Sequence, residues 1–261
     1  MNSLNTFNSL LSYNKISQNI VYKNWSEVPN LGGIMVESLT TAIGGGRMMY
    51  YDADEKKIYF TTTNDSATTN QNMHWAMIQN VGRGYNLFGY DIQTQQMFAL
   101  TPPPTGSFSI STYCDFITKI GSSLYVASTA FTTYIGVYNL CTLTWSSLSG
   151  FTVNNRVNSI MYNPTTNEIY IGGSFTSAST GNYITRYNLT TSTQSKINCD
   201  GTGMIVYHMT FNSANGYLYV CTDTISNAST SSGVVATLGG YGICIYDSVN
   251  NVWLNTLVYV G

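Results

Sequence analysis

A short unit built around a tyrosine recurs along this chain and constrains the fold more than any other feature. In each copy an alternating apolar stretch ends in Tyr followed by Asn or Asp, and a polar turn and a second alternating stretch come next. The copies are centred on Tyr13 (the weakest), Tyr90, Tyr138, Tyr187 and Tyr246. In this order the tyrosines lie 77, 48, 49 and 59 residues apart. The pattern predicts a β-hairpin at each copy.

A second hairpin precedes four of these copies. Its second strand carries an aliphatic residue followed by tyrosine, after a turn rich in turn-forming residues. The pairs are Ile58-Tyr59, Leu124-Tyr125, Ile169-Tyr170 and Leu218-Tyr219. Two hairpins make a four-stranded antiparallel sheet of about fifty residues, the size of a propeller blade. Because one blade cannot cover both of its faces, the repeated rings are expected to pack between blades. We therefore predict an all-β chain folded as a β-propeller.

Several repeats carry further residues in a family pattern. In two repeats six residues separate the tyrosine from a tryptophan, in another a glycine pair follows the second strand, and in two an arginine enters the first strand. These residues are Tyr138 and Trp145, Tyr246 and Trp253, Gly172 and Gly173, and Arg47 and Arg156. The pattern resembles the kelch-repeat family, which implies a kelch-like propeller. Met97, Gln194 and Ile20 stand where the other repeats would carry the tryptophan.

The repeats divide a single predicted domain, residues 1–261, into blades. The four complete predicted blades are residues 47–101, 111–149, 156–197 and 204–259. Residues 9–28, around Tyr13, match only the outer two strands of a further, partial blade. Three explanations for the missing inner pair stay open: residues 26–46 supply irregular strands, the chain is part of a longer one, or a neighbouring chain closes the ring.

Composition limits the kinds of partner. Only 8% of the residues are charged and the net charge is −2, against about 25% charged residues in ordinary globular proteins. We expect no nucleic-acid partner, because no basic patch is present. We also expect no membrane span, since no apolar run reaches about 18 residues. The first residues do not match the pattern of a signal peptide. The compartment stays open, and the neutral surface favours a virion or an extracellular assembly.

The residue types that commonly serve in catalysis or metal binding are few and far apart in this sequence. The two histidines, His74 and His208, are far apart in the sequence, and the five cysteines form no CxxC pair. Most of the cysteines are interpreted as small buried apolar residues. The acidic residues fall in turns or after the repeat tyrosine and do not form a recognisable pair of the kind that glycosidases use. We predict no catalytic residue, no metal site and no cofactor.

The predicted binding surface lies on two insertions between the second and third strands, residues 61–85 and 222–241. Insertions on one face of a propeller commonly build its binding surface. The candidate residues are Trp75, His74, Arg83 and Tyr85. Trp75 can stack on a sugar or anchor a protein contact, and a ring folded over the central channel is the alternative for it. The chain is therefore predicted to be a non-catalytic scaffold for a protein partner or neighbouring subunits. The alternative is a carbohydrate-binding or glycan-active propeller.

Overall fold

A computed structural model describes nine stretches of the chain. They are residues 46–62, 87–100, 114–129, 131–176, 182–197, 205–222, 225–229, 235–238 and 242–259. The described residues contain strands, turns and bends but no helix. The predicted partial blade, residues 9–28, lies outside them.

Sixteen of the eighteen strands in the described residues form four antiparallel sheets of four strands each. The first sheet contains β1 (Gly46–Asp52), β2 (Lys57–Thr62), β3 (Leu87–Asp91) and β4 (Gln96–Ala99). The second contains β5 (Cys114–Ile120), β6 (Ser123–Ser128), β7 (Ile135–Asn139) and β8 (Thr144–Ser147). The third contains β9 (Val157–Asn163), β10 (Glu168–Gly173), β11 (Ile184–Asn188) and β12 (Thr193–Lys196). The fourth contains β13 (Val206–Asn212), β14 (Tyr217–Thr222), β17 (Gly242–Asp247) and β18 (Val252–Tyr259).

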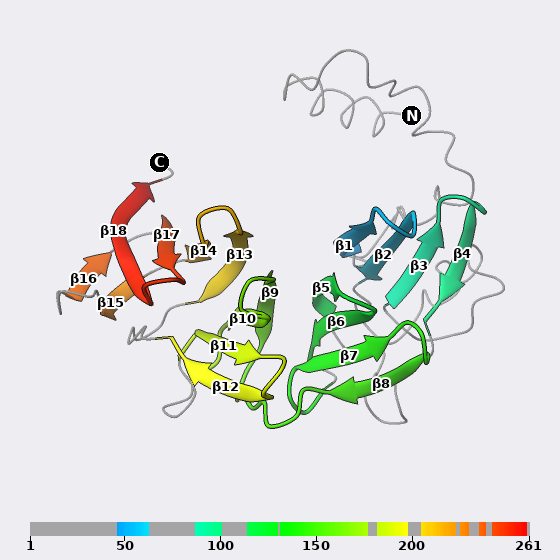
Figure 1. Cartoon of the computed structure of the whole chain (residues 1–261), viewed down its shortest axis with the longest axis horizontal. Coiled ribbons are helices and arrows are strands. Elements are labelled where there is room, and N and C mark those ends of the chain that lie inside the picture. Colours follow the sequence, from blue (N-terminus) through cyan, green and yellow to red (C-terminus); the bar gives the residue numbers. More distant parts are fainter. Residues whose placement is uncertain are drawn as a thin grey trace, which may run out of the picture.

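Within the described residues, these sheets are four successive blades of a β-propeller, which confirms the predicted fold class (Figure 1). We call them blades 1 to 4 in chain order. The first strand of each blade lies nearest the centre and the last strand lies outermost. Successive blades pack together through their first strands, β1 against β5, β5 against β9 and β9 against β13. The fourth blade carries an additional hairpin of β15 (Ile225–Ser229) and β16 (Val235–Leu238). This hairpin falls within the insertion 222–241, which the sequence presented only as a polar loop.

In the four described blades, the Asn or Asp that follows the repeat tyrosine closes the turn of the outer hairpin. In blade 2, Asn139 Oδ1 accepts hydrogen bonds from the backbone N–H groups of Cys141 and Thr142, both at 2.9 Å. The equivalent bonds form at Asp91, Asn188 and Asp247. A side-chain oxygen that bonds the backbone two residues on mimics a turn. The repeated Tyr-(Asn/Asp) pair therefore combines a packing residue with a turn-forming residue.

Each innermost strand contains a β-bulge at its second residue. The register against the next strand shifts there in all four blades, so that one extra residue is inserted into the innermost strand. The bulged residues are Arg47, Asp115, Asn158 and Tyr207. A bulge bends its strand and redirects a side chain. In blades 2 and 3 the redirected side chain reaches the next blade, as described below.

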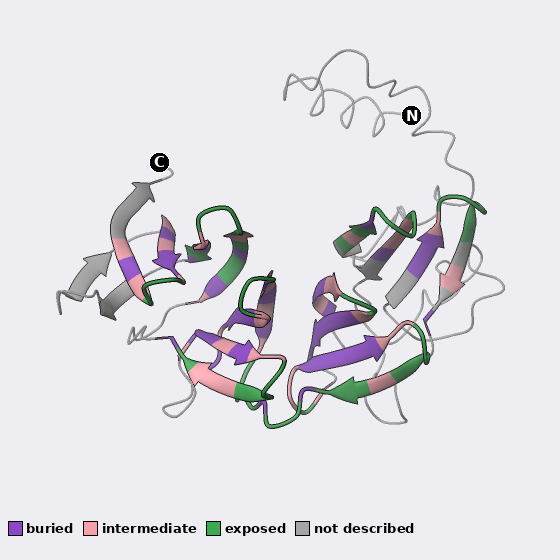
Figure 2. Cartoon of the chain, viewed as in Figure 1, coloured by how far each residue is buried: buried purple, intermediate pink, exposed green. Residues whose placement is uncertain are grey.

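The described residues form three core clusters, and each lies between two successive blades. Figure 2 shows buried residues concentrated on the inner strands of blades 2 and 3. Tyr138 belongs to the cluster between blades 1 and 2, Tyr187 to the next cluster, and Tyr246 and Trp253 to the third. Trp145 is half-buried and packs 5.0 Å from Tyr138, measured between ring centroids. The repeat aromatics therefore pack between blades.

The glycine pair of blade 3 permits close approach of neighbouring strands. A Cβ atom on Gly172 would lie 2.5 Å from Val206 Cγ1, and one on Gly173 would lie 2.0 Å from the Arg156 carbonyl oxygen. A side chain at Gly173 would displace backbone, and one at Gly172 would push β13 away. Gly172 thus allows blade 4 to pack closely on blade 3, while Gly173 accommodates the start of β9.

Candidate interaction site at the two end blades

Each blade has two faces with different side chains. We call the face turned toward the blade before it in sequence the preceding face, and the opposite one the following face. The fourth residue of the innermost strand lies on the preceding face. The tyrosine at the third position of the second strand lies on the following face. In the third interface, for example, Tyr170 of blade 3 packs in one cluster with Met209 of blade 4.

The three internal interfaces bury the same positions each time. On the following faces, Tyr59, Tyr125 and Tyr170 are all buried. On the preceding faces, the buried residues are Ile117, Ile160 and Met209 in the first strands, and Leu124, Ile169 and Leu218 in the second strands. Burying one such side chain stabilises a fold by about 1.5–3 kcal/mol. The faces of blades 2 and 3 are therefore matched halves of one repeated apolar interface.

Blade 1 exposes its preceding face. Met49 occupies the position of Ile117, Ile160 and Met209, yet its side chain is 65% exposed. Tyr51 on the same strand is 50% exposed, and Ile58 is half-buried. Apolar residues appear here because the repeat specifies an interface, and no described blade covers them.

Blade 4 exposes its following face. Tyr219 is only half-buried, although the equivalent tyrosines of the other three blades are buried. Cys221 and His208 are exposed, where blade 3 has buried Gly172 and Ser159. The bulged Tyr207 is 49% exposed. The ring of His208 also contacts Phe116 of blade 2, with centroids 6.1 Å apart.

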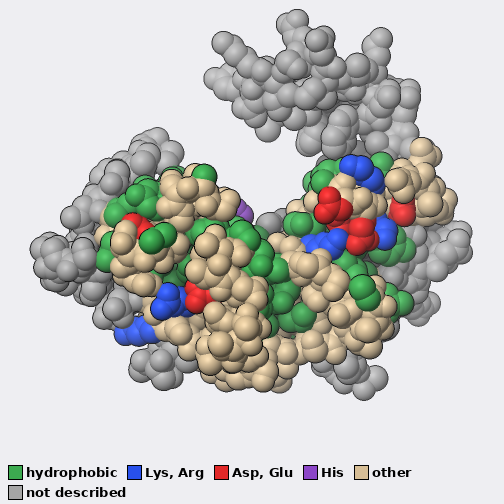
Figure 3. Space-filling model, viewed as in Figure 1, with side chains coloured by type: hydrophobic (Ala, Val, Ile, Leu, Met, Phe, Trp, Pro, Cys, Tyr) green, Lys and Arg blue, Asp and Glu red, His purple; other side chains and the backbone are tan. Residues whose placement is uncertain are grey.

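Figure 3 shows the described surface hollowed between blades 1 and 4. The first strands β1 and β13 do not pack against each other as the other successive first strands do. The described part of the chain therefore has two unmatched blade faces, which together form the candidate interaction site.

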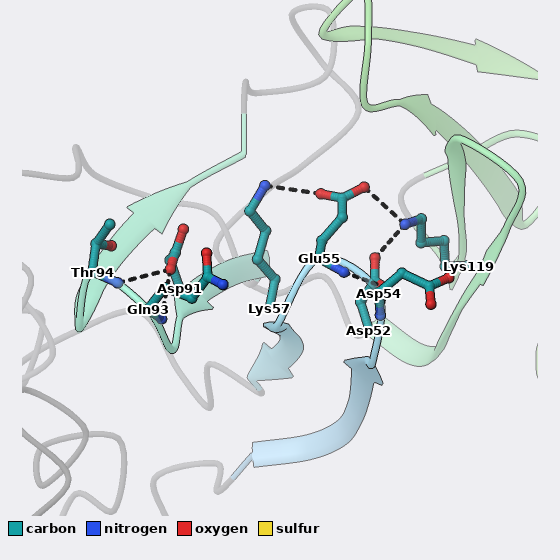
Figure 4. Close-up of polar contacts among 8 residues, drawn as sticks. All are labelled: Asp52, Asp54, Glu55, Lys57, Asp91, Gln93, Thr94 and Lys119. Carbon is teal, nitrogen blue, oxygen red and sulfur yellow. Dashed lines mark hydrogen bonds and ion pairs between the residues drawn. The ribbon is translucent and has the colours of Figure 1, made fainter.

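Ion pairs occupy the boundary between blades 1 and 2. Lys119 of β5 donates hydrogen bonds to Asp52 and, at 2.9 Å, to Glu55 Oε1, both in the first turn of blade 1 (Figure 4). Lys57 donates to the second oxygen of Glu55 at 2.8 Å. The side chains of Asp52 and Lys119 are mostly buried. In composition this cluster resembles a polar functional site. Its charged groups, however, are paired with one another across the boundary between blades 1 and 2.

The pKa values follow from this pairing. Burial alone would raise the pKa of Asp52, but hydrogen bonds from Lys119 and from the backbone N–H groups of Glu55 and Asp54 lower it below its ordinary value. Hydrogen bonds from Lys57 and Lys119 lower the pKa of Glu55. Burial alone would lower the pKa of Lys119, and its bonds to the two carboxylates raise it. These groups hold their charges firmly, unlike a general acid or base, whose pKa lies near the working pH.

Bulged residues connect the other two boundaries. Asp115 accepts two hydrogen bonds from Arg156, from Nε at 2.6 Å and from Nη2 at 2.8 Å. Asn158 Nδ2 donates to the Val206 carbonyl oxygen at 2.9 Å. In both cases the bulge of one blade reaches the start of the next innermost strand. Arg156, predicted to enter its strand, is therefore a residue that joins blades 2 and 3.

The predicted binding residues, Trp75, His74, Arg83 and Tyr85, lie outside the described residues. Arg47 lies in β1 at the bulge. Two of the four described cysteines, Cys114 and Cys244, are buried, as interpreted from the sequence, whereas Cys141 and Cys221 are exposed. Cys141 lies in a turn, and Cys221 lies on the following face of blade 4.

Within the described ranges, no group of three or more His, Cys, Asp or Glu side chains could hold a metal ion. Burial raises the pKa values of Tyr59 and Tyr246 to about 12, as expected for neutral core tyrosines. In the described part of the chain, no helix is long and apolar enough to cross a membrane.

Comparison with known proteins supports the fold and no more specific property of the chain. No family model matches the chain, and no curated protein matches it. The fold is similar to part of the extracellular domain of a hybrid two-component system of B. thetaiotaomicron, with a TM-score of 0.50 and 14% identity over 85% of this chain and 22% of that one. It is also similar to the hydrazine synthase of Kuenenia stuttgartiensis, with a TM-score of 0.50 and 13% identity over 86% of this chain and 53% of that one.

A third similar structure is the GH74 xyloglucanase of Xanthomonas campestris, with a TM-score of 0.50 and 10% identity over 83% of this chain and 30% of that one. The chain thus spans 22% to 53% of the length of these structures. At these identities the likeness defines a class, the β-propellers, and transfers no activity.

Proposed function

We propose that this chain is a non-catalytic propeller scaffold that binds protein, either a separate partner or neighbouring subunits of a larger assembly such as a virion. One observation carries the proposal: Met49 of blade 1 and Cys221 of blade 4 are exposed and Tyr219 of blade 4 is half-buried, at positions that blades 2 and 3 bury. Apolar side chains exposed at positions that the repeat buries elsewhere mark these two faces as candidate interaction sites.

A kelch-like repeat is part of the same proposal. It is supported by the close approach that Gly172 and Gly173 allow, by the packing of Tyr138 on Trp145 and by that of Tyr246 on Trp253. The charged residues also favour a scaffold, because Asp52, Lys119 and the Asp115–Arg156 pair join blades to one another.

The test uses the full chain in extract from its natural source, with crosslinking mass spectrometry to locate contacts. We expect a protein partner, whether a second copy or another chain, whose crosslinks map to the end faces of blades 1 and 4. Crosslinks confined to blades 2 and 3 would contradict the proposal. Specific binding on a glycan array, or turnover of a glycoside that is lost on mutating one acidic residue, would favour the glycan alternative.

The insertions 61–85 and 222–241 remain a second predicted binding surface. Replacing residues 64–82 by a short Gly-Ser link separates the two surfaces. Loss of the partner in this variant would place the binding on the insertions, and unchanged binding would place it on the end faces.

A further inference from the structure

We propose that the partner is a second copy of this chain, docked head to tail so that blade 4 of one copy packs on blade 1 of the next. This inference rests on the proposed function and names the partner. The added interface would repeat the one that already joins successive blades within the chain.

The interface between blades 3 and 4 defines the geometry. Opposite Gly172 of blade 3 lie the Val206 and Met209 side chains of blade 4, at 2.5 and 3.1 Å from the position that a Cβ would take. Ser159 Oγ accepts a hydrogen bond from the Met209 backbone N–H at 3.0 Å. The ring of Tyr170 packs on that of Phe211, with centroids 5.8 Å apart.

The strand registers transfer these contacts to the end faces. On blade 4, Cys221 occupies the position of Gly172 on blade 3. In the same way, His208 corresponds to Ser159, and Tyr219 corresponds to Tyr170. On blade 1, Gly46 takes the place of Val206, Met49 that of Met209 and Tyr51 that of Phe211. Two contacts of the internal interface therefore have a counterpart: that of Gly172 with Met209 corresponds to Cys221 with Met49, and that of Tyr170 with Phe211 corresponds to Tyr219 with Tyr51.

The residue sizes are complementary at the tightest point. In the internal interface a glycine, Gly172, faces the larger Val206. Across the end faces the order is reversed, because Cys221 supplies a side chain and Gly46 supplies none. Either combination leaves one side chain between two strands, which avoids both a clash and a void. Blade 1 thus carries a glycine at the position that would face Cys221.

A docking partner has to cover two different exposed faces, that of blade 1 and that of blade 4. A separate protein that fits only one face would leave the other apolar and exposed, whereas a second copy presents the matching half to each. The contact is heterologous, so copies add in one direction and form a closed ring or an open chain.

The experiment introduces a thiol opposite Cys221. The variant is M49C in a C141S/C199S background, treated as the full-length chain with a short bismaleimide. We expect crosslinks between copies that join positions 49 and 221, in a yield that rises with protein concentration. The matched controls are the same background without M49C, and M49C combined with C221S; both should lose this crosslink. Since Met49 is mostly exposed, M49C is expected to fold normally.

Sedimentation velocity on the chain without crosslinker gives the second readout. We expect association that M49D weakens at least about tenfold, because it places a charge in an apolar interface. A monomer at every concentration, or a 49–221 crosslink within one copy, would overturn the head-to-tail proposal. Slow alkylation of the thiol from M49C in a monomer would also overturn it, since another segment would then cover this face.

Association that M49D leaves unchanged, without the 49–221 crosslink, would likewise overturn head-to-tail docking. The scaffold function would survive such a result, because it requires a protein partner but not this one. It would fail only if no protein bound through the end faces or the insertions.

Discussion

Met209 and Met49 occupy the same position in the innermost strands of blades 4 and 1. Met209 is 1% exposed and Met49 is 65% exposed. The two strands share their bulge and their pairing with the second strand, so local structure does not explain the contrast. The difference lies in the neighbour: Met209 packs against blade 3, and no described blade precedes blade 1.

The tyrosines of the second strands show the same contrast from the opposite side. Tyr59, Tyr125 and Tyr170 are buried under the following blade, whereas Tyr219 is half-buried. A repeat sequence therefore specifies both halves of an interface in every blade, including the end blades. In repeat proteins stability is approximately a sum of repeat and interface terms, so the internal and end positions should respond differently to the same mutation.

The largest expected effect is at the internal interface between blades 3 and 4. Trp253→Ala should lower the free energy of unfolding by about 3–5 kcal/mol, because it removes a large buried ring that packs 5.3 Å from Tyr246. Urea unfolding measures the loss. The half-buried Trp145 is the matched comparison, and Trp145→Ala should cost less. An unchanged midpoint for Trp253→Ala would place this ring on the surface.

A smaller effect is expected where Asp115 and Arg156 join blades 2 and 3. Asp115→Asn removes one charge of a bidentate pair and should cost about 1–2 kcal/mol. Arg156→Lys keeps the charge but loses the fork geometry, so its cost should fall between wild type and Asp115→Asn. Both are read from urea midpoints. No loss in either variant would show that this ion pair does not hold blades 2 and 3 together.

The boundary between blades 1 and 2 should respond to pH instead. The pKa values of Asp52 and Glu55 are lowered in the folded protein. Their contribution to stability is therefore present above the unfolded pKa values, near pH 4, and is lost as the pH falls through the folded values. Lys119→Met should flatten the fall in melting temperature below pH 4. The same slope in this variant and in wild type would exclude Lys119 as the cause.

The smallest effect is expected in an outer turn far from any interface. Leu143 has a φ of 57° and is 55% exposed, so Leu143→Gly should stabilise the protein by about 0.5–1 kcal/mol by relieving an unfavourable left-handed conformation. Gly121, with a φ of 57° and open space around it, is the converse control, and Gly121→Ala should destabilise. Thermal unfolding distinguishes the two directions. A loss of stability in Leu143→Gly would show that the Leu143 side chain makes a contact that matters.

The sequence was sufficient to predict the propeller, because each blade repeats two kinds of residue. The tyrosines mark the faces that pack, and the Asn or Asp after them closes a turn. The four-stranded sheets and the aromatic packing between blades followed from this repeat.

The remaining features could not be predicted from the sequence, for physical reasons. The bulges at Asp115 and Asn158 leave no mark in an alternating pattern, because they insert one residue that depends on the neighbouring strand. The hairpin β15–β16 lies in a stretch of small polar residues, which suggested a loop. The exposure of Met49 depends on what lies beside blade 1, and the repeat pattern does not contain that information.

The central claim is that the end blades carry unfilled halves of the internal interface. The most direct test compares Met209→Ala with Met49→Ala in urea unfolding at a concentration where the chain is monomeric. We predict that Met209→Ala lowers the free energy of unfolding by about 2–5 kcal/mol, and that Met49→Ala changes it by less than about 0.5 kcal/mol. Equal losses would show that Met49 is buried within the monomer, and the end faces would then not be open.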